Sequence, residues 1–281
     1  MTIVHIIILL AAGILTGFFS GLLGVGGGAI LTPAQDIVYA SMGVAEDMTI
    51  KLAFGTNLLV ILPTAVSGAW RHHRKGVVRW KIAAVMGSCT FIAALGGATL
   101  ATQLSGAGLK IAFGILLLAT GIRMLTAKLP EIEQEPKDNP WLWLAWAIPI
   151  GFATGIMGFG AGVVAVPILV LALRFRMHNA VATSLAIMIF SSIGGVIGYI
   201  INGLGVPDLP AYSIGYVNLP TWFLLAVTSI GMAQVGAITA HRLPAQKIGY
   251  IFVALMLIMG LRMLGAGLRM LGVLDLPGWL I

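Results

Sequence analysis

The sequence predicts an all-α protein that crosses a membrane several times and is built from two related halves. Of its 281 residues, 59% are hydrophobic and only 9% are charged, whereas soluble domains carry about 25% charged residues. Apolar runs of roughly 18 residues or more, long enough for membrane helices, recur along the whole chain. A glycine-rich stretch, Gly17 to Pro33, aligns without a gap with Gly151 to Pro167.

The apolar segments follow one another with short polar connections. Strands are not expected, because alternation with a period of two is absent. The first and fifth segments have about thirty residues, whereas one crossing needs roughly 20. Each is therefore one long tilted helix or two pieces joined at the glycines. In chain order the segments are expected at about Ile3 to Leu31, Leu52 to Trp70, Ile82 to Leu104, Leu109 to Leu125, Trp141 to Leu173, Ala180 to Ile201, Trp222 to Thr239 and Ile248 to Leu264.

The similarity between the halves extends beyond the glycines. Thr56-Asn57 corresponds to Thr183-Ser184, and Gly121 to Leu125 corresponds to Gly260 to Leu264. Such self-similarity indicates an internal duplication. We expect a first transmembrane repeat at residues 1–129, a polar, proline-bounded linker at 130–140, and a second transmembrane repeat at 141–281. Each repeat has about four to five membrane segments.

The distribution of Lys and Arg bears on the relative orientation of the repeats. If each glycine segment crosses once, the repeats are parallel and ten of the sixteen basic residues lie on the cytoplasmic side. If each glycine segment is a hairpin, the repeats are inverted and only Lys51, Lys110, Arg262 and Arg269 lie outside. The positive-inside rule therefore favours two inverted repeats.

The glycine stretches have two physical interpretations. Small residues at i and i+4, such as Gly17 and Gly21, let membrane helices pack closely. Alternatively the helix is broken, which leaves backbone N–H groups free to face a ligand, as in transporters built from paired repeats. Packing alone has no need of three consecutive glycines at Gly26 to Gly28. The sequence therefore favours glycine-broken first helices.

Polar residues within the segments indicate the kind of ligand. The nine acidic residues lie at segment ends or in loops, which disfavours a site for cations, because carboxylates usually form such sites in membranes. Neutral donors remain, notably Thr56-Asn57 and Thr183-Ser184, and donors without acids suit an anion. Hydrogen bonding between helices is the alternative role for each of them.

Other residues exclude several function classes. The single Cys89 rules out a disulfide framework and a cysteine metal site. The run from Arg71 to Lys75 is interpreted as a cytoplasmic loop, with an anion-attracting funnel as the alternative. No nucleophile elbow, phosphate loop or metalloprotease motif occurs, so we expect no enzyme, no cofactor and no metal. The net charge of +7 points to topology and contact with membrane lipid, not to nucleic acid.

The duplicated glycine motif, with a proline a few residues on, resembles the sulfite exporter (TauE/SafE) family of prokaryotic membrane transporters. The Thr-Asn and Thr-Ser elements and the polar central linker strengthen the resemblance, which covers essentially the whole chain. It implies a secondary transporter of small sulfur-containing anions, such as sulfite or organosulfonates, in the prokaryotic inner membrane. An uncoupled anion channel and a non-transporting scaffold are the alternatives, and the oligomeric state stays open, a homodimer included.

The resemblance also implies which elements face the substrate. Two departures between the halves, Ala161 in place of Gly27 and Ser184 in place of Asn57, predict an asymmetric pocket. Alternating access would come from rocking one repeat against the other. The implied substrate-binding residues are Gly24, Gly26, Gly27, Gly28, Thr56, Asn57, Gly158, Gly160, Ala161, Gly162, Thr183 and Ser184.

Overall fold

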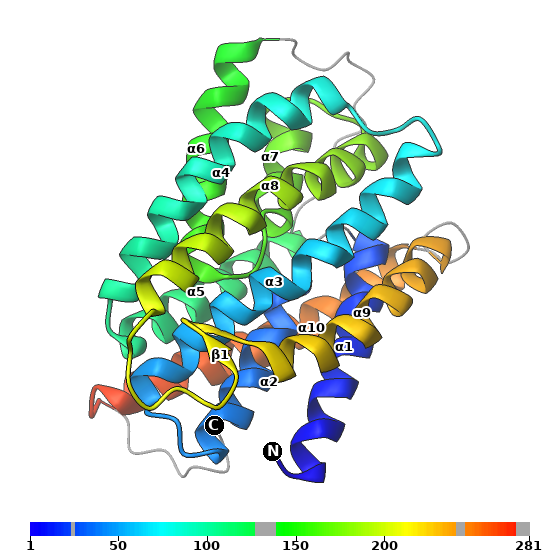
Figure 1. Ribbon diagram of the computed structural model, residues 1–281. Coiled ribbons are helices and arrows are strands. Elements are labelled where there is room, and N and C mark those ends of the chain that lie inside the picture. Colours follow the sequence, from blue (N-terminus) through cyan, green and yellow to red (C-terminus); the bar gives the residue numbers. More distant parts are fainter. Residues whose placement is uncertain (24–25, 127–138, 240–244, 274–281) are drawn as a thin grey trace.

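A computed structural model describes residues 1–23, 26–126, 139–239 and 245–273. Within these ranges the chain forms ten helices and one short β-hairpin (Figure 1). The elements are α1 (Ile3–Leu23), α2 (Gly28–Ser41), α3 (Glu46–His73), α4 (Trp80–Gln103), α5 (Gly106–Thr126), α6 (Pro140–Met157), α7 (Gly162–Leu171), α8 (Met177–Gly203), β1 (Ser213–Ile214), β2 (Val217–Asn218), α9 (Leu219–Thr239) and α10 (Ala245–Met270).

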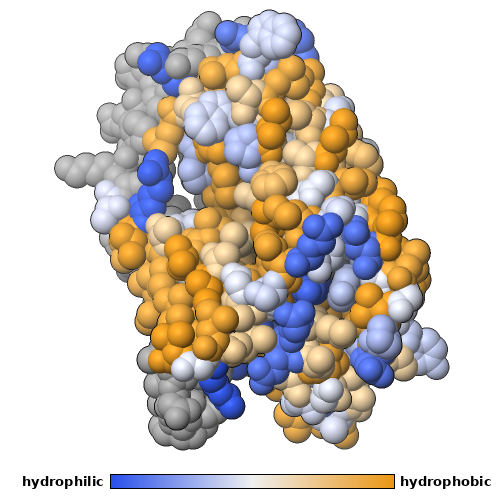
Figure 2. All heavy atoms as spheres, turned by 90° about the vertical axis from the view of Figure 1, so that its left-hand side faces the viewer, coloured by the Kyte–Doolittle hydropathy of each residue, from blue (hydrophilic) through white to orange (hydrophobic). Residues whose placement is uncertain are grey.

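The predicted all-α polytopic membrane fold is confirmed. Seven helices in the described part are long and apolar enough to cross a membrane. Large apolar side chains such as Ile92, Ile148 and Ile258 are more than half exposed, as expected where lipid replaces water. Apolar residues dominate the face drawn in Figure 2, with hydrophilic ones gathered in limited patches.

The first glycine stretch is a hairpin. Gly26 and Gly27 have φ angles of 83° and 70°, which only glycine adopts without strain, and the helix breaks there. The Thr16 hydroxyl donates to the Gly27 carbonyl at 3.4 Å, and His5 Nε2 lies 2.9 Å from Ser41 Oγ. The start of α1 therefore lies beside the end of α2, so the chain enters on α1 and returns on α2 (Figure 1).

The second glycine stretch is also broken into two helices. Gly158, with a φ of 61°, ends α6, Gly160 has a φ of 80°, and α7 begins at Gly162. The long apolar run expected at Trp141 to Leu173 is thus two helices and not one tilted crossing. Trp143, near the start of α6, belongs to the same buried cluster as Leu169 and Leu173 near the end of α7.

Corresponding helices of the two halves run antiparallel. In α3 and α8, a Cβ on Gly55 would lie 3.0 Å from Tyr199 Cβ, whereas one on Gly68 would lie 3.1 Å from Leu185. In α5 and α10, Gly114 approaches Gly260 and Gly121 approaches Leu257. An inverted duplication would produce these pairings, but the repeats and their boundaries remain predictions. Most of the expected linker, residues 130–138, lies outside the described residues.

The earlier glycines of each stretch, at the same spacing in both halves, serve close packing. A Cβ on Gly17 would lie 2.3 Å from the Ser229 carbonyl oxygen, and one on Gly21 would lie 2.0 Å from that of Ala233, on α9. Gly151 and Gly155 of α6 approach Thr90 and Ala94 of α4 in the same way. Both interpretations of the glycine stretches therefore apply, to different glycines: the first two of each stretch pack helices and the later ones break them.

Candidate functional site

The two helix breaks meet inside the protein. A Cβ on Gly28 would lie 2.3 Å from Phe159 Cα, and one on Gly26 would lie 2.8 Å from the Phe159 carbonyl oxygen. Gly160 packs against side chains, because its Cβ would lie 3.1 Å from Met188 Sδ and 3.2 Å from Ile61 Cγ2. Phe159, Ile61 and Met188 are all buried. The later glycines thus let the two breaks approach to backbone contact.

Two helix N-termini lie at these breaks. α2 begins after Gly27 and α7 begins after Ala161, and neither of these N-cap residues makes a side-chain capping bond. The first N–H groups of a helix carry partial positive charge and attract anions. Gly26, Gly27, Gly28, Gly158, Gly160, Ala161 and Gly162 therefore surround two uncapped N-termini, whereas Gly24 lies outside the described residues.

Asn57 belongs to a buried polar cluster between α2 and α3. Its Nδ2 donates to Thr32 Oγ1 at 2.7 Å, and its Oδ1 accepts a bond from Gln35 Nε2. Gln35 Oε1 in turn accepts from the Tyr39 hydroxyl at 3.2 Å, and that hydroxyl also lies 3.4 Å from Thr56 Oγ1. We call these residues, all fully buried, the α2–α3 polar cluster: Thr32, Gln35, Tyr39, Thr56 and Asn57.

The two threonines of the repeated Thr-Asn and Thr-Ser elements play matching parts. Thr56 Oγ1 accepts a bond from the backbone N–H of Asn218 at 3.0 Å, directly before α9. Thr183 Oγ1 accepts one from the backbone N–H of Arg79 at 3.2 Å, directly before α4. Each threonine therefore fixes the segment that leads into a neighbouring helix: Thr56 fixes the segment before α9, and Thr183 fixes the segment before α4.

Ser184 is placed differently from Asn57. It is fully buried, and its hydroxyl donates to the Val181 carbonyl of its own helix at 2.8 Å. The α7 side of this region presents apolar residues, among them Val166 and Leu169. The structure thus brings Thr56 and Asn57 together with polar side chains of α2, and gives Thr183 and Ser184 no such cluster within the described residues.

Asp36 corrects an expectation. The segment bounds predict Asp36 at the end of a segment, whereas it lies within α2 and is 8% exposed. Its Oδ1 lies 2.9 Å from Lys110 Nζ of α5, and the Thr49 hydroxyl also donates to it. The hairpin is the physical reason, because it turns α2 back into the protein. A buried carboxylate is therefore present.

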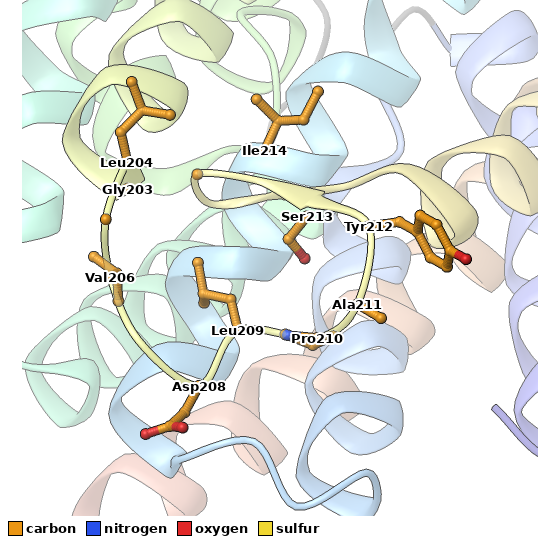
Figure 3. A pocket seen from close by; sticks show the side chains of 12 residues that line it. Gly203, Leu204, Val206, Asp208, Leu209, Pro210, Ala211, Tyr212, Ser213 and Ile214 are labelled. Carbon is orange, nitrogen blue, oxygen red and sulfur yellow. The ribbon is translucent and has the colours of Figure 1, made fainter.

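A hollow of about 480 Å³ lies in a part of the sequence remote from the two glycine stretches. It is formed by residues 203–215, the connection between α8 and β1, and Asp208 is the charged residue of its lining (Figure 3). No residue of the helix breaks or of the α2–α3 polar cluster lines it. We therefore place the candidate site at the helix breaks and not in this loop.

Comparisons with known proteins agree with a transporter. The family model described as "Sulfite exporter TauE/SafE" matches residues 9–263. A probable membrane transporter protein of Methanocaldococcus jannaschii is 27% identical over 259 residues, which cover 92% of this chain and 94% of that protein. One from Haemophilus influenzae is 28% identical over 262 residues, which cover 92% of this chain and 97% of that protein. No solved structure matches the chain.

Proposed function

Because the chain belongs to the sulfite exporter TauE/SafE family and is therefore a membrane transporter, we propose that it carries small sulfur-containing anions across the prokaryotic inner membrane. Sulfite and short organosulfonates are the substrates of this proposal. The anion binds between the two helix breaks and is carried by alternating access, in which two inverted repeats rock against each other.

The meeting of the two breaks is the observation that supports this proposal most directly. Gly26 and Gly28 touch Phe159, so the uncapped N-termini of α2 and α7 begin on either side of one contact. Backbone N–H groups at such ends hold oxyanions without a side-chain charge. Neutral donors also suit a transported ligand, because a fixed cation at the centre would hold the anion too strongly for release.

The α2–α3 polar cluster gives the first half the larger share of the binding. Asn57 Nδ2 and the hydroxyl of Thr32 lie about one turn into α2 from its first residue, Gly28. Their bonds are satisfied within the protein, so an anion exchanges protein–protein hydrogen bonds for protein–anion ones. Such an exchange keeps the net affinity modest. Thr183 and Ser184 contribute hydrogen bonds to the anion from the second half, in the state of the transport cycle that opens toward them.

The two threonines suggest how access alternates. Thr56 holds the segment before α9 and Thr183 holds the segment before α4. Since α3 and α8 run antiparallel, these segments lie toward opposite ends of the helix pair. Rocking frees one segment while the other stays bonded, which opens the centre to one side at a time.

The first test is thermal stability of the detergent-purified protein with sulfite, thiosulfate, sulfate, short sulfonates and short carboxylates. A ligand that binds only the native state stabilises it by about 2.7 kcal/mol at 100 times its Kd. We expect a saturable upward shift with a sulfur anion, and a smaller one in Asn57→Ala. Gly96→Ala is the matched control, because nothing lies within 4 Å of a Cβ there.

The alternatives predict other outcomes. A scaffold, in which the glycines only pack helices, gives no shift with any anion. An uncoupled channel gives the shift, but unlabelled anion on the opposite side of the proteoliposome membrane does not accelerate its flux of labelled anion. A saturable flux that unlabelled anion on the opposite side accelerates supports the carrier.

A further inference from the structure

A second site lies at the other end of α2, away from the helix break. Asp36 of α2 and Lys110 of α5 form an ion pair of 2.9 Å whose side chains are 11% and 5% exposed. Burying two charges is costly, and ionisable groups within membrane segments commonly mark the paths of protons and ions. The pair is therefore a candidate for a role beyond packing.

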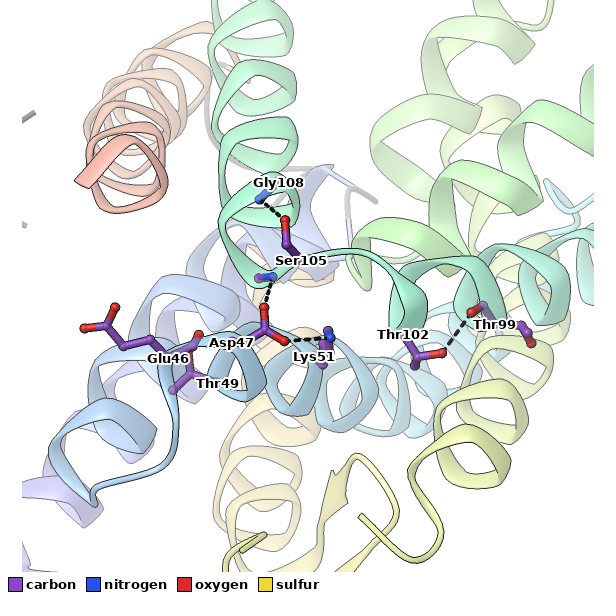
Figure 4. A network of polar contacts seen from close by, with 9 residues as sticks. Glu46, Asp47, Thr49, Lys51, Thr99, Thr102, Ser105 and Gly108 are labelled. Carbon is purple, nitrogen blue, oxygen red and sulfur yellow. Dashed lines mark hydrogen bonds and ion pairs between the residues drawn. The ribbon is translucent and has the colours of Figure 1, made fainter. Parts of the chain in front are cut away.

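The surroundings of Asp36 are rich in cations. Thr49 of α3 donates to its carboxylate, and Arg262 of α10 interacts with it electrostatically. Beside it, Asp47 pairs with Lys51 at 2.9 Å and accepts the backbone N–H of Gly106 (Figure 4). His5 of α1 lies at the end of α2, where it is hydrogen-bonded to Ser41. The cluster thus holds two acids, Asp36 and Asp47, against three cations, Lys51, Lys110 and Arg262.

We infer that Asp36 binds a proton that is transported together with the anion, with Lys110 as the charge that couples the two. When Asp36 is ionised, the pair is neutral. When a proton from the adjacent aqueous face joins its carboxylate, Lys110 loses its partner and the cluster gains one positive charge in a poorly screened interior. A bound anion then offsets the added charge, so proton and anion bind with mutual preference.

The geometry favours a proton over a metal cation. The Lys110 ammonium and the Thr49 hydroxyl both contact Oδ1 of Asp36, so a sodium ion at that oxygen would have to displace them. Nor do the described residues contain a group of three or more His, Cys, Asp or Glu side chains that could hold a metal ion. Protonation needs no ligands beyond the carboxylate itself.

The distance to the anion site is short enough for electrostatic coupling. Asp36 is eight residue steps along α2 from Gly28, a rise of about 12 Å. The side of α2 between them carries the α2–α3 polar cluster, so the intervening space is polar and not a packed hydrocarbon layer. The rocking that exposes the anion to the other side of the membrane also opens the polar side of α2. Asp36 is then exposed to that aqueous phase, and its carboxylate loses the proton there.

The inference rests on the proposed anion transport, so the experiment measures the two separately. Proteoliposomes are assayed for exchange of labelled for unlabelled isethionate and sulfite at equal pH, and for accumulation driven by a pH difference of one unit. Isethionate keeps one charge throughout that range. One proton per anion supports about tenfold accumulation on the alkaline side, since a factor of ten corresponds to one pH unit.

Asp36→Asn is expected to reduce the ratio of anion concentrations across the membrane from about ten to about one, while exchange remains measurable. Asp36→Asn alone leaves Lys110 buried without its carboxylate partner. The double variant Asp36→Asn/Lys110→Gln removes both charges, and it too should exchange the anion without accumulating it. Asp208→Asn is the control: Asp208 lies in the loop hollow between α8 and β1, outside this cluster, and its φ of 60° is one that asparagine also adopts. It should keep the tenfold accumulation.

Each outcome decides something. Tenfold accumulation by Asp36→Asn or by the double variant overturns the inference and leaves anion transport standing. Loss of accumulation in Asp208→Asn as well as in Asp36→Asn also overturns it, because the effect is then not specific to Asp36. If the wild type exchanges neither isethionate nor sulfite, the proposed function fails and the inference fails with it.

Discussion

The two short helices that return from the glycine breaks, α2 and α7, occupy matching places but bury opposite chemistry. On α2 the residues that face the neighbouring helices are Thr32, Gln35, Asp36 and Tyr39. The positions that align with them in the second half are Val166, Leu169, Val170 and Leu173, and all four are buried and apolar. The first half therefore buries a polar layer at these positions, whereas the second half buries an apolar layer at the aligned positions.

The features that the two halves share are those that fix the backbone. Gly17 and Gly21 pack on α9 as Gly151 and Gly155 pack on α4, and the two threonines bond matching backbone N–H groups. The comparison teaches that the framework is common to both halves, whereas the hydrogen-bonding and charged groups are concentrated in the first.

The largest effect is expected where both halves depend on glycine. A valine at Gly28 would place Cβ 2.3 Å from Phe159 Cα, and one at Gly158, whose φ is 61°, would place it 2.4 Å from Phe54 Cα. Overpacking costs about 1–3 kcal/mol in either variant. At position 158, holding the β-branched valine in a left-handed conformation costs a similar amount in addition. We expect both variants to lose most of their folded yield in size-exclusion chromatography.

Gly96→Ala and Gly231→Ala are the controls for these variants, since both glycines are helical and a Cβ on either would meet nothing within 4 Å. They should fold as the wild type does. A folded Gly28→Val beside an unfolded Gly158→Val would show that only the second break is held tightly, and would end the claim of a common framework.

A smaller effect should separate the halves. Asn57→Ala leaves Thr32 and Gln35 without their buried partner, at a cost of about 1–3 kcal/mol for each group left unsatisfied. Ser184→Ala removes only a bond to its own helix, which is worth about 0.5–1.5 kcal/mol at most. Thermal unfolding in detergent should show the larger drop for Asn57→Ala. Equal drops would contradict the asymmetry.

The smallest effect concerns the segments before α9 and α4. Asn218 caps α9, since its Oδ1 accepts from the Thr221 N–H at 3.1 Å and from the Thr221 hydroxyl at 2.8 Å. Arg79 precedes α4 without a side-chain cap, and its bond to Thr183 uses the backbone. Asn218→Ala should cost about 1 kcal/mol.

Arg79→Ala serves as the counterpart, with an expected change within about 0.5 kcal/mol, because the backbone bond survives. Hydrogen exchange of the segments at 77–79 and 216–218 measures both. Faster exchange at 77–79 in Arg79→Ala would show that the arginine side chain holds its segment after all.

Much of the backbone could be predicted from the sequence because glycine is locally informative. Gly26 to Gly28 predicted a broken helix, and the positive φ angles at Gly26 and Gly27 explain why. The positive-inside rule favoured hairpins, and the contact of His5 with Ser41 agrees for the first of them. The family followed from the same duplicated stretch.

The polar layer could not be predicted in the same way, because it depends on contacts between distant segments. The apolar pattern predicts Asp36 at a segment end, because it lies just beyond the apolar run that ends near Leu31. The Lys and Arg pattern predicts on which side of the membrane Lys110 lies, but it gives no sign that Lys110 is buried against Asp36. A signal did exist: polar residues at positions 32, 35, 36 and 39 recur with helical spacing and mark one side of a helix.

The short length of α7 has a consequence for how the protein is made. Its ten residues span about 15 Å, half the thickness of the bilayer's hydrocarbon layer of about 30 Å. Such a segment cannot settle in lipid alone when it leaves the ribosome, because its ends would expose backbone polar groups to hydrocarbon. Its buried side packs on α8, which is synthesised afterwards. Membrane insertion of α7 therefore has to wait for the chain that follows it.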